Sequence, residues 1–61
     1  MPNLTAKELS AIEDQLSKEH LLVKKYKCYA CMTNDPQIKA SCEQIASKHL
    51  DHYNRLLSHL S

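Results

Sequence analysis

The chain has 61 residues, a formal net charge of +1 and no glycine, tryptophan or phenylalanine. This length allows one domain and leaves little room to bury a core without a partner. The lack of glycine excludes glycine-rich phosphate loops and dinucleotide fingerprints, and the near-neutral charge argues against a nucleic-acid binder, which is normally basic. With 43% hydrophobic and 25% charged residues, the composition predicts a folded globular protein.

The lack of a recognisable targeting signal and the number of cysteines both predict synthesis in the cytoplasm. No apolar run approaches the roughly 18 residues of a membrane-spanning helix, and the N-terminal residues lack the basic and apolar segments of a signal peptide. Cys28, Cys31 and Cys42 form an odd set, which favours reduced thiols over a disulfide framework in so short a chain. We therefore expect a protein without membrane contact.

Two helix-start signals divide the chain. Thr5 and Glu8 have the spacing of a capping box, in which each side chain bonds the backbone N–H of the other residue. Asp35 is a favourable N-cap, and Pro36 suits the first position of a helix. Each signal precedes a long stretch without a helix breaker.

These signals predict a single domain over residues 1–61. It contains a helix over about 6–33, a turn over about 34–35 and a second helix over about 36–60. A turn this short forces the two helices to lie antiparallel. The predicted fold class is therefore all-α, an antiparallel two-helix hairpin.

Apolar spacing predicts a heptad seam along each helix, with steps of three and four residues. The a and d positions are Leu9, Ile12, Leu16, Glu19, Val23, Tyr26, Ala30 and Thr33 in the first helix, and Ile38, Cys42, Ile45, His49, His52, Leu56 and His59 in the second. Further apolar residues flank this seam, so the stripe is wider than one neighbouring helix can cover. We expect two hairpins to pair as a homodimeric four-helix bundle.

Ionisable residues interrupt the seam at Glu19, His49, His52 and His59. Such groups are costly to bury unless they are paired or bind metal. The turn position places Glu19 opposite about residue 50, facing His49 and His52, which share a helical face at i and i+3. Three interpretations stay open: a transition-metal or zinc half-site, duplicated near the axis of a dimer; a polar layer that fixes register; or groups that stay solvated.

The cysteines give a weaker signal. Cys28 and Cys31 form a single C-x-x-C on the outward side of the first helix, without the second pair that a zinc site would need. Their position near a helix C-terminus disfavours thiolates. Cys42 lies on the seam, where it is expected to act as a small hydrophobic residue. Cross-linking between molecules and a redox role of the outer pair stay open.

Three short runs carry a resemblance to a known family. The sequences LVKKY at 22–26, DPQIK at 35–39 and KHLDHY at 48–53 resemble spore coat protein F and its small relatives. The hairpin is also similar to half of a ferritin-like bundle, whose helices supply a Glu and a Glu-x-x-His motif in duplicate.

This resemblance implies that Glu19 is the carboxylate ligand and that His49 or His52 is the histidine ligand. The motif is incomplete, because His49 replaces its Glu if His52 is the ligand, and Ala46 replaces it if His49 is the ligand. A histidine-rich site implies zinc, copper or nickel rather than a pair of irons.

Two function classes follow. The first is a structural or assembly protein of spore-coat type, which pairs with itself and with other coat proteins. The second is a metal-binding protein that uses Glu19, His49 and His52 for zinc, nickel, copper or iron. An enzyme is not expected, because no substrate pocket or open coordination position can be identified from the residues.

Overall fold

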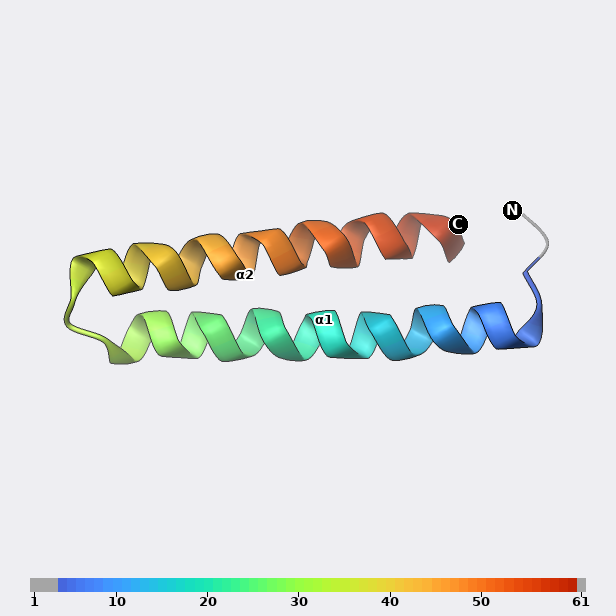
Figure 1. Ribbon diagram of the computed structural model, residues 1–61, viewed down its shortest axis with the longest axis horizontal. Helices are drawn as coiled ribbons and strands as arrows, with labels where there is room; N and C mark the ends of the chain where they lie inside the picture. The colour runs from blue at the N-terminus through green and yellow to red at the C-terminus, as the bar shows by residue number, and fades with distance from the viewer. Residues whose placement is uncertain (1–3, 61) are drawn as a thin grey trace.

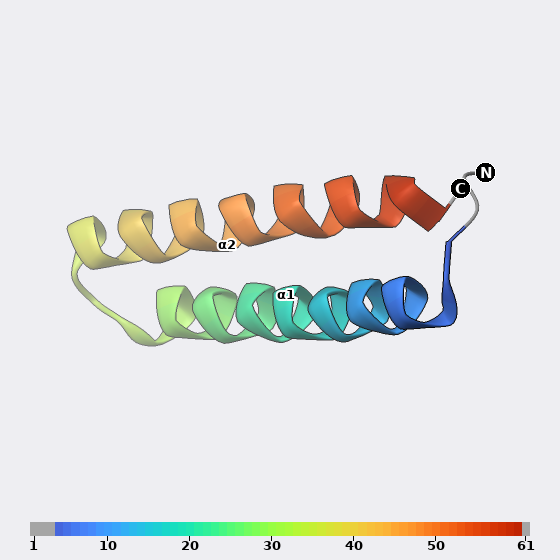
Figure 2. The ribbon, with the colours of Figure 1, turned by 45° about the vertical axis from the view of Figure 1, so that its right-hand side comes forward.

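The computed structural model describes residues 4–60, which form two long helices joined by a short turn (Figure 1). Helix α1 spans Ala6–Met32 and helix α2 spans Pro36–Leu57, followed by a 3₁₀ turn, η1, over Ser58–Leu60. The helices lie antiparallel and side by side in both views (Figures 1 and 2), and the chain measures 47 × 14 × 11 Å. The predicted all-α hairpin is confirmed.

The start of α1 is fixed by the predicted capping box. The Thr5 hydroxyl accepts from the Glu8 N–H at 3.1 Å, and the Glu8 carboxylate accepts from the Thr5 N–H at 3.0 Å. The bond from the Thr5 backbone, aided by the Thr5 side chain, lowers the pKa of the Glu8 carboxyl below its usual value, because it favours the ionised form.

The turn is fixed by Asp35. Its carboxylate accepts from the N–H of Gln37 at 2.8 Å and of Ile38 at 3.3 Å, which satisfies donors that the first turn of α2 leaves open. The Asp35 N–H in turn donates to the Thr33 hydroxyl at 3.1 Å. Helix α1 ends at Met32, and the final residues of the second predicted helix form the 3₁₀ turn instead.

The contact between the helices is narrow. The buried residues among 4–60 are Glu19, Val23 and Ala30 from α1 and Cys42 and Ala46 from α2. On α1 they belong to the predicted seam. Cys42 is buried, as is common for a free cysteine that acts as a small hydrophobic residue.

Within the single hairpin, the stripe of α2 and η1 that faces α1 differs from the predicted seam, because His52 and His59 do not lie on it. Both histidines are exposed, whereas Ala46 is buried and Tyr53 and Leu60 are half-buried. Two neighbouring stripes along α2 and η1 satisfy the same heptad spacing, one containing Ala46, Tyr53 and Leu60, the other Ile45, His52 and His59. The hairpin buries the stripe with more apolar surface, because that gains more free energy.

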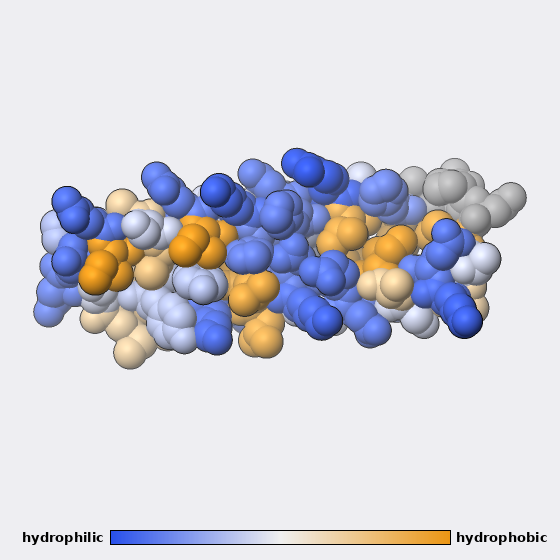
Figure 3. All heavy atoms as spheres, viewed as in Figure 1, coloured by the Kyte–Doolittle hydropathy of each residue, from blue (hydrophilic) through white to orange (hydrophobic). Residues whose placement is uncertain are grey.

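Much apolar surface stays uncovered. No large side chain among residues 4–60 is fully buried, and the exposed large hydrophobic residues are Leu9, Leu21, Tyr29, Met32, Ile38, Leu50 and Leu57. Figure 3 shows several groups of hydrophobic residues between polar ones along one face. Neither helix of the described residues has the length and apolarity to cross a membrane.

Candidate functional site

A buried carboxylate lies near the middle of the hairpin. The Glu19 side chain is only 6% exposed, and each of its oxygens faces an imidazole. Oε1 lies 2.6 Å from Nδ1 of His49, and Oε2 lies 3.2 Å from Nδ1 of His52. The structure therefore brings together the three residues that the register of the hairpin predicted.

The two histidines that contact Glu19 differ in their exposure to solvent. His49 lies on the inward stripe of α2, with 24% of its side chain exposed, whereas His52, one turn later, lies at the edge with 51% exposed. The Nδ1–H of His49 can donate a hydrogen bond to Oε1, whereas Nδ1 of His52 lies within ion-pair distance of Oε2. No buried side-chain nitrogen or oxygen among residues 4–60 lacks a partner, so the cluster is satisfied as a hydrogen-bonded layer.

The same three residues have the chemistry of a metal site. One donor atom from each of Glu19, His49 and His52 lies within 4.8 Å of the other two. Metal–ligand bonds of 2.0–2.2 Å separate the donors around a tetrahedral ion by about 3.3–3.6 Å. The 2.6 Å contact from Glu19 to His49 is a hydrogen-bond distance, so an ion would replace the proton and open this contact by less than about 1 Å.

A run of rings crosses the hairpin beside this cluster. The Tyr29 and Tyr26 rings meet edge to face at 5.6 Å, Tyr26 stacks on His49 at 6.3 Å, and His49 meets His52 at 5.9 Å. The run thus passes from α1 to α2 on one side of the molecule, which we call the His52 face. We expect these rings to limit the freedom of both imidazoles.

A cavity adjoins Glu19 on the His52 face. It has a volume of about 270 Å³ and is lined by Glu19, His52, Arg55, Leu56 and His59. His59 therefore lines the same cavity as Glu19 and His52. Sequence reasoning did not single out Arg55, whose spacing of three residues from His52 places it on the same helical face.

The opposite face has a different character. There the rings of His20 and Tyr53 lie 6.0 Å apart, and a groove of about 490 Å³ runs between the helices. This groove is lined by Lys27, Ala30, Cys31, Lys39, Glu43, Ala46, Ser47 and Leu50. Cys28 and Cys31 are both exposed and far along α1 from Glu19, so they do not belong to the Glu19 cluster.

Comparison with known proteins adds no family assignment. No protein-family model, curated protein or solved structure matches this chain.

Proposed function

We propose that this chain is a small structural protein of spore-coat type that works as a homodimeric, ferritin-like four-helix bundle. The observation that carries this proposal is the uncovered apolar surface of the hairpin. No large side chain among residues 4–60 is fully buried, while seven large hydrophobic ones are exposed. A hairpin of this kind gains little from burial, and a second copy would supply the missing core.

The His52 face is the surface best suited to the second copy. Leu22 and Tyr29 on α1, and Ile38 and Ile45 on α2, recur at seven-residue spacing, the period of bundle packing. Tyr29 is 42% and Ile38 52% exposed, and Tyr29 begins the run of rings that ends at His52. The stripe of Ile45, His52 and His59, which does not face α1 in the single hairpin, would then face the partner.

The opposite face is less suitable, because three charged residues line its groove, whereas Arg55 lines the cavity of the His52 face and Lys25 there lies over the Tyr29 ring. Leu50 and Leu57 are 42% and 44% exposed there, and Lys27, Lys39 and Glu43 line the groove beside them. Burying these charges without partners would cost free energy.

Matched double variants test the dimer and its face. The wild-type chain should sediment at twice its monomer mass at micromolar concentration. Tyr29→Lys with Ile38→Lys should abolish the dimer and lower the helix content with it, whereas Leu50→Lys with Leu57→Lys, at similar exposure on the other face, should stay dimeric and folded. A folded wild-type monomer, or dissociation caused only by the second pair, would contradict the proposal.

Metal binding is a second candidate function, favoured by the convergence of three donor atoms within 4.8 Å at Glu19, His49 and His52. The resemblance to ferritin-like proteins supports it, and a two-fold dimer on the His52 face would bring two such half-sites near its axis. The histidine content favours zinc, nickel or copper over iron. Without an ion the cluster would serve as a polar layer that sets the register of the bundle.

Thermal unfolding with added metal distinguishes these two roles. Zn²⁺ or Ni²⁺ at about 100 times its Kd should stabilise the folded state by about 2.7 kcal/mol. His49→Ala and His52→Ala should abolish this shift, while His20→Ala, on the opposite face, should keep it. If the melting temperature does not respond to metal and no metal co-elutes from gel filtration, the metal-binding role is excluded and the polar layer remains.

A further inference from the structure

A second group of metal-ligating side chains lies outside the site described above, near the C-terminal end of α1. It consists of Cys28, Cys31 and Met32. We propose that these three residues bind a soft monovalent metal ion, copper(I), on the outer surface of the hairpin. This site is independent of the Glu19 cluster and of the proposed dimer face.

The positions of the sulfur atoms support the proposal. The Cys28 thiol donates to the Met32 thioether, with Sγ and Sδ 3.7 Å apart, so two of the donors already lie side by side. Cys31 follows Cys28 by three residues, and helix geometry places their Cβ atoms about 5–6 Å apart. The three residues therefore lie within little more than one turn of one helix, and sites built on a helix are more precise than sites on a loop.

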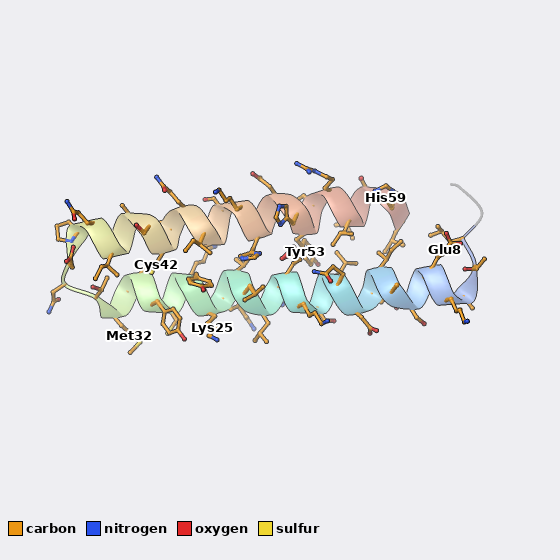
Figure 4. The ribbon with its side chains drawn as sticks, viewed as in Figure 1. Glu8, Lys25, Met32, Cys42, Tyr53 and His59 are labelled. Atoms are coloured by element: carbon orange, nitrogen blue, oxygen red, sulfur yellow. The ribbon has the colours of Figure 1, made fainter. Side chains whose placement is uncertain are left out.

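All three side chains are accessible from solvent. Cys28 and Cys31 are exposed, Met32 is 73% exposed, and Figure 4 shows Met32 projecting from α1 on the side away from α2. An ion can thus bind without separating the helices. Cys42 is buried between the helices and takes no part.

The chemistry of the donors selects the ion. Two thiols and a thioether are soft ligands, which prefer copper(I), whereas zinc favours four thiolate, imidazole or carboxylate ligands. On binding, the S–H bonds of Cys28 and Cys31 break, two sulfur–copper bonds form and both protons pass to solvent. Met32 donates a lone pair without losing a proton. The copper remains copper(I), so no oxidant or reductant is needed.

Nearby lysines favour the resulting complex, in which two thiolates and one copper(I) carry a net charge of −1. Lys24 and Lys27 precede Cys28 and Cys31 by one helical turn each, the spacing at which side chains are neighbours. Lys27 and Cys31 also line the same groove. These positive charges oppose the unfavourable negative end of the α1 dipole.

Anaerobic titration of the reduced full-length chain with copper(I), in competition with a chromogenic copper(I) chelator, tests the site. We expect one copper per chain and an ultraviolet thiolate–copper absorption band. Cys28→Ser and Cys31→Ser should each weaken copper(I) affinity by about a hundredfold or more, and Met32→Leu by about tenfold. Mutating residues that only support metal ligands already lowers metal affinity by about 10–100-fold. Cys42→Ala, which removes the buried thiol, should bind as wild type does.

Two results would overturn the proposal. One is copper(I) affinity that is unchanged in both Cys28→Ser and Cys31→Ser. The other is loss of copper(I) binding in a His49→Ala, His52→Ala variant, which would move the ion to the Glu19 cluster. Circular dichroism of each variant verifies that it is folded. Failure of either metal proposal leaves the other intact, because their ligands do not overlap.

Discussion

Replacing Glu19 by glutamine removes the charge at the centre of the hairpin and keeps the size of the side chain. Glu19 is nearly fully buried, and its 2.6 Å contact to His49 is short. A hydrogen bond to a charged group is worth about 1.5–3 kcal/mol. His52 is half exposed, so solvent screening limits its share to about 0.2–1 kcal/mol. Since glutamine keeps one acceptor, we expect Glu19→Gln to cost about 2 kcal/mol.

For a chain of this size, that loss corresponds to a fall of about 8–16 °C in the melting temperature. The assay is urea and thermal unfolding of metal-free protein, with all variants at the same concentration so that association does not shift the comparison. A double-mutant cycle then separates the two contacts. The coupling between Glu19 and His49 should be about 1.5–3 kcal/mol, and that between Glu19 and His52 below about 1 kcal/mol.

The reasoning would be refuted if Glu19→Gln changed stability by less than about 0.5 kcal/mol, the scale of an ordinary surface substitution. Equal coupling of Glu19 to both histidines would also contradict it. In either case the burial of the Glu19 carboxylate between the helices would not determine its contribution to the free energy of unfolding.

Two further predictions concern the helix starts. Asp35→Ala should destabilise the hairpin by about 1 kcal/mol, because two N–H groups of α2 lose their acceptor. Asp35→Asn, which keeps a side-chain acceptor, should retain most of this stability in the same urea melts, and equal losses in the two variants would refute the capping role. Since the pKa of the Glu8 carboxyl is lowered, its contribution to stability should be fully present above the pKa of the unfolded chain and lost as the pH falls through the lower, folded-state pKa. Glu8→Gln, which keeps the capping acceptor, should remove this part of the acid dependence, and identical pH profiles of the two proteins would exclude it.

The elements of the fold were predictable because their signals are local. The capping box at Thr5 and Glu8, and the Asp35–Pro36 pair, act within one helical turn, so the residue types alone specify them. The meeting of Glu19 with His49 and His52 was also predictable, since a short turn leaves little freedom in register. The position of the turn and the rise per residue together determine which residues of the two helices lie opposite each other along the hairpin axis.

The rotation of α2 about its own axis was not predictable in the same way. Cys42, His49 and Leu56 belong to both candidate stripes, so the heptad pattern is equally satisfied by either. The choice depends on how much surface Tyr53 and Leu60 bury against α1, which is a property of packing. The cavity beside Arg55 depends on the same packing and could not be identified from spacing alone.

The central claim is that two hairpins fold as one bundle, and the concentration dependence of thermal unfolding tests it most directly. If folding and association are coupled, the melting temperature should rise by about 10 °C between about 1 and 100 µM chain, because RT ln 100 is divided by the unfolding entropy of two chains. A melting temperature that stays constant over this range, for a protein whose folded mass is that of one chain, would contradict the claim.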